Sequence, residues 1–123
     1  MPRLKSMSNA KVLNTTSFEE LKNTTGYYLV DLWATWCPPC KAMSPVIDSL
    51  SQDEDLKAIT FFKCDVDDQP EISDFFAVSS IPAFFLIKSK GDGTLNLETD
   101  VIKKFIGTKS PFDFKIALKN EIK

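Results

Sequence analysis

Two cysteines, Cys37 and Cys40, enclose two prolines and follow Trp36. If this segment begins a helix, the cysteines lie on one face with Cα atoms about 5–6 Å apart, within reach of a disulfide. Free N–H groups and the helix dipole at that end favour a thiolate and lower the pKa of the first thiol. We expect an exposed first thiol to attack a disulfide and a shielded second thiol to resolve the product. Pro38 and Pro39 stiffen the loop and so tune the exchange.

Structural cysteines and half of a zinc site are the alternatives for this motif. The chain has three cysteines and no histidine, which excludes a four-thiolate zinc site and every histidine-ligated metal site. The same composition excludes Ser-His-Asp and Cys-His nucleophile pairs. Thiol–disulfide exchange is therefore favoured, and we expect no metal and no cofactor. The third cysteine, Cys64, lies in a strand-like segment and is expected to be a small core residue.

The elements around the motif must place it at the end of a sheet. Residues 28–34, just before the cysteines, form an apolar run with one acid, which predicts a strand buried on both faces. Apolar residues at helical spacing predict a helix over residues 37–51. Further strands are predicted over 58–66, 83–88 and 101–106, and helices over 17–22, 70–76 and from 110 onward. This alternation indicates an α/β domain with a central sheet.

Local signals refine this expectation at two places. Ser17 and Glu20 form a capping box that predicts the start of the first helix. The turn at Gly91-Asp92-Gly93 joins the last two strands as an antiparallel pair, so the sheet should be mixed.

Length and composition set further limits. The 123 residues suffice for one domain, which we place at residues 9–123 after a flexible tail over residues 1–8. A net charge of −2 provides no basic surface for nucleic acid or an anionic membrane. The longest apolar run, residues 83–87, is far shorter than the roughly 20 residues of a membrane span. The first residues lack the apolar core of a secretion signal, so we expect a cytoplasmic protein.

Three segments resemble the thioredoxin family in its order and close to its spacing. They are residues 30–41 around the cysteines, Asp65-Val66-Asp67-Asp68, and Ser80-Ile81-Pro82-Ala83. The resemblance covers residue 9 to the C-terminus. It implies the thioredoxin fold, a mixed five-stranded sheet with helices on both faces, and thiol–disulfide exchange as the activity. The implied partners are disulfide-containing client proteins and an NADPH-dependent thioredoxin reductase.

The resemblance assigns roles to four residues. Cys37 is similar to the attacking thiol of the family, and Cys40 to the resolving thiol. Asp31 matches a buried acid that exchanges protons with the second cysteine. Its apolar neighbours in the strand independently predict a desolvated carboxyl group with a raised pKa. Lys63 matches a basic residue that approaches this acid in bacterial members.

The resemblance also implies a substrate-binding face. Pro82 matches a cis-proline beside the disulfide, and the backbone of Ile81 would pair with an extended substrate strand. Gly107 is similar to a glycine that keeps the docking groove open. Trp36, next to the reactive thiol, is expected to be partly exposed and to contact substrate.

Two departures from the family pattern concern partner choice. The usual dipeptide between the cysteines is Gly-Pro, whereas Pro38-Pro39 is typical of tryparedoxins and nucleoredoxin-like relatives, whose insertions this chain lacks. The segment from Pro82 to Gly107 is longer than usual.

Two other functions stay open: a docking module without turnover, and a disulfide oxidase or isomerase. The intact cysteine pair favours a protein-disulfide reductase, which we expect to be a monomer.

Overall fold

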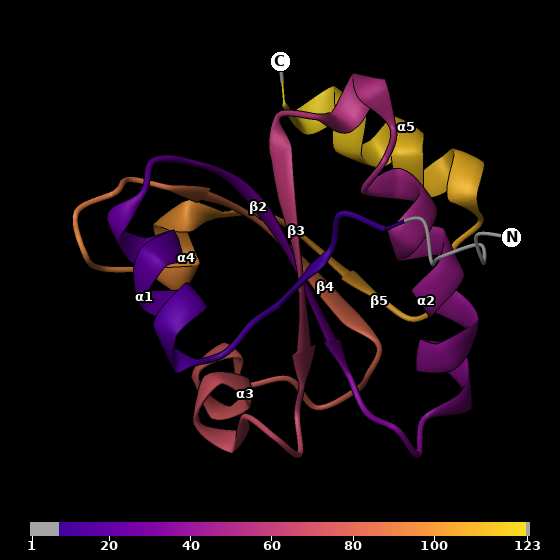
Figure 1. The fold of residues 1–123 in the computed structure, drawn as a ribbon, viewed down its shortest axis with the longest axis horizontal. Coiled ribbons are helices and arrows are strands. Elements are labelled where there is room, and N and C mark those ends of the chain that lie inside the picture. Colours follow the sequence, from indigo (N-terminus) through magenta and orange to yellow (C-terminus); the bar gives the residue numbers. More distant parts are fainter. Residues whose placement is uncertain (1–7, 123) are drawn as a thin grey trace, which may run out of the picture.

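The computed structural model describes residues 8–122, which form a five-stranded sheet with helices on both sides (Figure 1). The strand order is β1-β3-β2-β4-β5, so β1 and β5 are the edges. β2 pairs in parallel with β3 and antiparallel with β4, which makes the sheet mixed, as predicted. The strands are β1 (Lys11–Val12), β2 (Gly26–Trp33), β3 (Ile59–Asp65), β4 (Ala83–Ser89) and β5 (Val101–Ile106).

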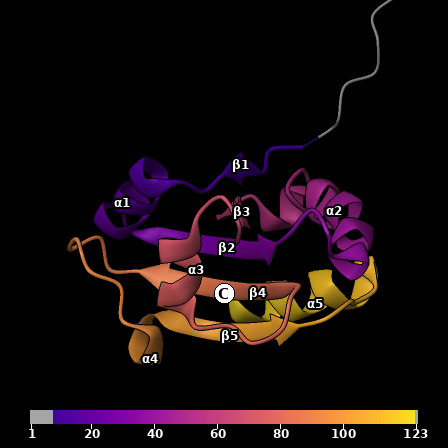
Figure 2. The ribbon, with the colours of Figure 1, turned by 90° about the horizontal axis from the view of Figure 1, so that it is seen from below.

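The helices divide between the two faces of the sheet, as Figures 1 and 2 show. One buried cluster joins α1 and α3 to the sheet, and a second joins α2 and α5 to the opposite face. Phe84 packs edge-on against Phe114 in the second cluster, with ring centroids 5.1 Å apart. The helices are α1 (Thr15–Asn23), α2 (Pro38–Leu50), α3 (Pro70–Phe76), α4 (Leu97–Asp100) and α5 (Pro111–Glu121).

The start of α1 differs from the prediction. Asn14, not Ser17, is the N-cap: its side chain accepts a hydrogen bond from the backbone N–H of Ser17. The Ser17 hydroxyl accepts in return from the N–H of Asn14, which completes a capping box. The proposed box of Ser17 and Glu20 is therefore wrong, because the helix begins two residues earlier. The expected tail over residues 1–8 lies outside the described residues except for Ser8, which donates to Asp48.

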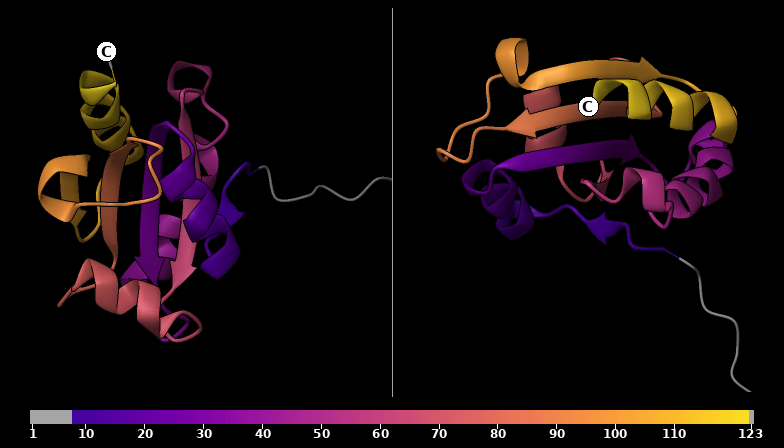
Figure 3. Two further views of the ribbon diagram at one scale, coloured as in Figure 1. Left: turned by 90° about the vertical axis from the view of Figure 1, so that its left-hand side faces the viewer. Right: turned by 90° about the horizontal axis from the view of Figure 1, so that it is seen from above.

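The connection between β4 and β5 contains the short helix α4, which no pattern in the sequence predicted (Figure 3). The Asn96 side chain caps it by accepting from the N–H groups of Glu98 and Thr99. The buried Asp100 carboxylate accepts from Lys90 Nζ at 2.6 Å and from the Asn96 N–H at 2.9 Å. These bonds hold the connection against the end of the sheet farthest from the cysteines.

Within residues 8–122, no helix has the length and apolar character needed to cross a bilayer.

Candidate functional site

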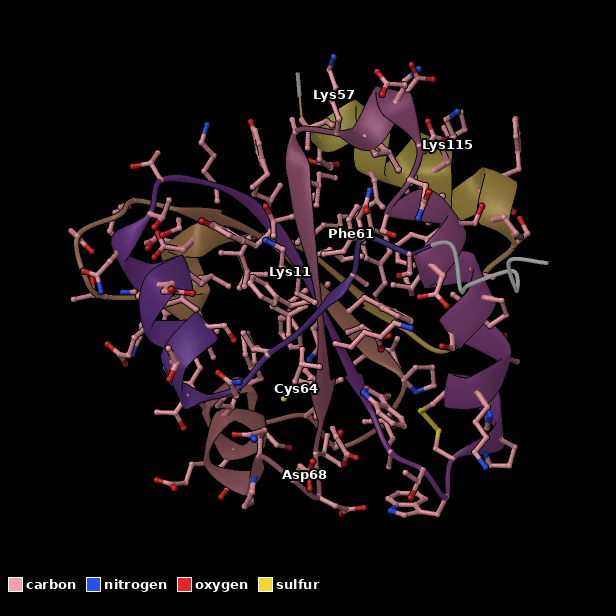
Figure 4. All side chains as sticks on the ribbon, in the orientation of Figure 1. Lys11, Lys57, Phe61, Cys64, Asp68 and Lys115 are labelled. Carbon is pink, nitrogen blue, oxygen red and sulfur yellow. A yellow bond between two sulfur atoms is a disulfide. The ribbon has the colours of Figure 1, made fainter. Side chains whose placement is uncertain are left out.

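The cysteine pair lies where β2 ends and α2 begins, as the sequence predicted. Cys37 is the N-cap of α2 and forms a disulfide with Cys40, with Cα atoms 5.3 Å apart. Figure 4 shows this disulfide as the yellow bond at the start of α2. Pro38 and Pro39 occupy the first two helical positions and have no N–H group. The Cys40 N–H is therefore the first available helical donor, and it points at Cys37 Sγ from 3.2 Å.

The expected contrast in exposure between the two thiols is absent. Cys37 is 4% exposed and Cys40 is 3% exposed, and both pack against Ala34. The disulfide explains this result, because it holds the two sulfur atoms together against the end of the sheet. Cys37 Sγ also lies 3.9 Å from the carbonyl oxygen of Ile81, on the segment across the site. The two sulfur atoms therefore differ here in their hydrogen bonds and not in their exposure.

Asp31 lies on β2 behind the disulfide and is 3% exposed. Burial raises the pKa of its carboxyl group to about 7, while the charge of Lys63 acts in the opposite direction. No described residue donates a hydrogen bond to this carboxylate. Asp31 and Cys40 line the same cavity of about 310 Å³. The desolvated acid expected from the sequence is thus present, and it shares a cavity with the second cysteine.

Lys63 neighbours Asp31 but is bound elsewhere. The two residues are register partners on β3 and β2, so their side chains share one face of the sheet. The Lys63 ammonium donates to Ser44 Oγ and to Asp48 Oδ1, each at 2.8 Å, and both acceptors belong to α2. Sequence reasoning missed Ser44 and Asp48, because only the packing of α2 on β3 brings them to Lys63.

The face beside the disulfide contains the four residues expected to bind substrate. Trp36 is 65% exposed, and its Nε1–H donates to Asp67 Oδ2 at 2.8 Å. The Ile81–Pro82 peptide bond is cis, as the resemblance implied. Gly107 has φ of 87° and donates its N–H to the Pro82 carbonyl. A Cβ at Gly107 would meet no atom within 4 Å, so the positive φ is what makes glycine the favoured residue there.

Cys64 is separate from this site. It is a fully buried free thiol on β3, labelled in Figure 4, and packs in the cluster under α1 and α3. Burial raises the pKa of its thiol to about 12, so it stays protonated and unreactive. The expectation of a core cysteine is therefore confirmed. Among residues 8–122, no three acidic or thiol side chains are grouped so that they could hold a metal ion.

Comparison with known proteins identifies the family. The family model named Thioredoxin matches residues 9–108, which include the cysteine pair and the cis-proline. The chain belongs to the thioredoxin family. Thioredoxin from Listeria monocytogenes is 40% identical over 82 residues, covering 67% of this chain and 77% of the relative.

Solved thioredoxin structures agree with this assignment. Mitochondrial thioredoxin 3 from Saccharomyces cerevisiae, in its oxidized form, is 32% identical. It gives a TM-score of 0.70 over 90% of this chain and 93% of that one. Thioredoxin from Malassezia sympodialis is 25% identical, with a TM-score of 0.75 over 98% and 96% of the two chains. The thioredoxin fold predicted from the sequence is confirmed.

Family membership and the disulfide together establish the reaction class. Curated thioredoxins match the chain, and the Cys37–Cys40 disulfide lies at the start of a helix at the end of the sheet. The chain is a thiol–disulfide oxidoreductase of the thioredoxin family. Proteins of this family act on disulfide-containing substrates and usually receive their electrons from a reductase.

Proposed function

We propose that the chain reduces protein disulfides, with Cys37 as the attacking thiol and Cys40 as the resolving thiol. The observation that carries this assignment is the position of Cys37 as the N-cap, with the Cys40 N–H directed at its sulfur. A backbone donor at 3.2 Å stabilises negative charge on that sulfur after reduction. Cys40, one turn further into α2, has no such placement.

The reaction balances in two exchanges. The Cys37 thiolate attacks one sulfur of the client disulfide, forms a mixed disulfide and releases the other client sulfur as a thiolate, which takes up a proton. The Cys40 thiol then loses its proton and attacks Cys37 Sγ. This step forms the Cys37–Cys40 disulfide and releases the second client thiol. Two electrons pass from the enzyme dithiol to the client, and a reductase that uses NADPH returns them.

Asp31 is the proposed acceptor of the Cys40 proton. It shares a cavity with Cys40, and a pKa of about 7 leaves the carboxyl group able to gain or lose a proton near neutral pH. The positive charge of Lys63 opposes the effect of burial on that pKa.

Client binding is proposed for the face formed by Trp36, Ile81, Pro82 and Gly107. Trp36 offers an exposed aromatic surface next to the disulfide. The Ile81 backbone would pair with an extended client segment, in the manner of an added strand. Gly107 leaves open space beside the cis-proline. Pro38 and Pro39 are proposed to tune the redox exchange through loop stiffness and the missing N–H groups.

Two single substitutions test the roles of the cysteines. We expect Cys37→Ser to abolish insulin reduction with dithiothreitol as electron source. Cys40→Ser should accumulate mixed disulfides with clients, because attack proceeds and resolution does not. Covalent adducts on the Cys37→Ser protein but not on the Cys40→Ser protein would reverse the assignment. A docking module would show no turnover at all.

The direction of the reaction requires a separate measurement. Titration against glutathione or dithiothreitol buffers gives the reduction potential, which separates a reductant from an oxidase or isomerase. We expect the potential of a reductant. A cytoplasmic location, a monomeric state and the single domain over residues 9–123 stay predictions from the sequence.

A further inference from the structure

Lys63, whose charge opposes the effect of burial on the Asp31 pKa, is bound by two residues of α2 that together form a clamp. Ser44 Oγ and Asp48 Oδ1 each accept from Lys63 Nζ at 2.8 Å. These two residues are four positions apart, so they lie on the same face of α2. The side chains of Lys63 and Asp48 are 22% and 23% exposed, which makes the pair half-buried and only weakly screened by solvent.

The clamp leaves Asp31 without a direct cationic partner. Lys63 is its register partner on the adjacent strand, and both residues line the cavity that also contains Cys40. The Lys63 ammonium nevertheless donates to α2, and no described residue donates to Asp31. The charged or titratable groups that α2 and β3 place around this carboxyl group are Cys40, Lys41, Asp48, Lys63 and the neutral thiol of Cys64. The β4 residue paired with Asp31 is the uncharged Phe84.

We propose that Ser44 and Asp48 are positioning residues for the thiol chemistry, which bind the Lys63 ammonium on α2 instead of at Asp31 and so set how tightly the Asp31 carboxyl group holds its proton. Their effect is indirect, since the hydrogen bonds that they accept come from Lys63 and not from the cysteines. Free to rotate, the Lys63 ammonium could approach Asp31 across the paired strands and favour its ionised form. The inference concerns the proton affinity of Asp31, and its catalytic consequence rests on the proposed role of Asp31.

Asp48→Asn removes the charged half of the clamp while keeping an oxygen that can accept from Ser8. Loss of the Asp48 charge and a weaker bond between Lys63 and an uncharged amide oxygen both favour ionised Asp31, so the two effects have the same sign. We expect the Asp31 pKa, followed by carboxyl carbon NMR in the oxidised protein, to fall below about 7. A tenfold loss of proton affinity would raise the ionised fraction at pH 6 from about a tenth to about a half.

A double-mutant cycle separates the positioning effect from the direct charge effect. In a Lys63→Gln background no ammonium remains to be released, so adding Asp48→Asn should lower the Asp31 pKa much less than in the wild-type background. Ser44→Ala changes no charge and removes one acceptor, so it should lower the Asp31 pKa by a smaller amount than Asp48→Asn. Equal shifts in both backgrounds, or an unchanged Asp31 pKa in Asp48→Asn, would overturn the proposal.

Asp53→Asn is the matched control. Asp53 is also 23% exposed and also pairs with a lysine, Lys115 at 2.9 Å, on a part of the molecule away from the disulfide. The Asp53→Asn substitution removes one negative charge, as Asp48→Asn does, and leaves the bonds of Lys63 in place, so the Asp31 pKa should stay at its wild-type value. A fall in the control equal to that in Asp48→Asn would show a net-charge effect and overturn the proposal.

The pH dependence of insulin reduction distinguishes this inference from the proposed function. If Asp31 accepts the Cys40 proton, the midpoint of the pH–rate profile should move to lower pH in Asp48→Asn, together with the Asp31 pKa. A lower Asp31 pKa with an unmoved rate profile would support the clamp and contradict the proton-transfer role of Asp31.

Discussion

Asp31 and Asp100 are both little exposed, at 3% and 4%, yet their pKa values shift in opposite directions. Asp31, at the disulfide end of the sheet, has no hydrogen bond from any described residue, and burial raises its pKa to about 7. Asp100, at the far end, accepts from the Asn96 N–H and from Lys90 Nζ. These bonds hold the pKa of Asp100 below its ordinary value. Burial is the largest influence on the Asp31 pKa, whereas at Asp100 the hydrogen bonds outweigh burial.

The two acids therefore affect stability in opposite pH ranges. The folded chain binds the Asp31 proton more tightly than the unfolded chain, so this contribution is complete below pH 3.8 and is lost as pH rises towards about 7. Asp100 favours the charged form in the fold, so its contribution is present above pH 3.8 and is lost as pH falls through its lowered pKa. Asp31 therefore gains or loses its proton near neutral pH, whereas Asp100 stays charged there and binds the connection between β4 and β5.

Asp100→Ala should have the largest effect on the free energy of unfolding. It leaves the Asn96 N–H and the Lys90 ammonium without their acceptor, and we expect a loss of about 2–3 kcal/mol at pH 7 in denaturant unfolding. The rate of insulin reduction should not change. The control is Glu98→Ala, an exposed acid of the same helix, with an effect within about 0.5 kcal/mol. A loss no larger than the control would contradict a structural role for Asp100.

Asp31→Asn should act in the opposite direction. At pH 8 the substitution removes a buried charge, which stabilises the fold, and buries an amide in its place, which costs part of that gain. The net result should be a rise of about 1–3 kcal/mol in the free energy of unfolding. The gain should shrink towards pH 4, where the native carboxyl group is already neutral. Insulin reduction at neutral pH should slow without stopping. An unchanged pH–rate profile would remove Asp31 from proton transfer.

Cys64→Ala extends the comparison to a buried titratable group, a thiol, that stays neutral in the fold. The thiol is neutral in the fold, where its pKa is about 12, and in the unfolded chain below its ordinary pKa of 9.0, so the loss of stability should not vary with pH between about 5 and 7. We expect about 1 kcal/mol from the lost packing, measured by denaturant unfolding, and full activity. A disulfide that includes Cys64 in the oxidised protein would show that it is not a core residue.

Pro38→Gly should have the smallest effect on stability. Glycine increases the freedom of the unfolded chain, which should cost about 0.4–1 kcal/mol of unfolding free energy. It also restores an N–H at the first helical position, so alkylation of reduced Cys37 at acidic pH should be slightly faster. Slower alkylation would indicate that loop rigidity, rather than donor number, stabilises the thiolate. Pro39→Gly is a matched variant one position further into α2.

Strong local patterns in the sequence predicted most of the fold. α3 was expected over residues 70–76 and has those bounds, since Pro70 can occupy only the first turn of a helix. β2 was recognised from its apolar run because both of its faces are covered. β1 was missed: two exposed residues, Lys11 and Val12, are too few to show a strand period. α4 was missed because four residues, Leu97–Asp100, show no helical period.

The site was predictable where the chemistry is local. Cys37, Cys40 and Asp31 follow from neighbours within a few positions along the chain. Ser44 and Asp48 did not, since their bonds to Lys63 depend on how α2 lies across β3, 15 or more residues away. The exposure of Cys37 was misjudged for a related reason, because its packing against Ala34 and the segment at Ile81 depends on contacts that no helix pattern indicates.

The two edge strands affect the tendency of the protein to aggregate at high concentration. The outer side of β5 is an open edge of the sheet, a template on which another chain could add a strand and begin aggregation. Exposed lysines at positions 103 and 104 stand in the middle of this strand, and their charge repels an identical edge. At the opposite edge, β1 is only two residues long and includes Lys11. The lysines on both edge strands therefore disfavour edge-to-edge pairing of two copies of the sheet.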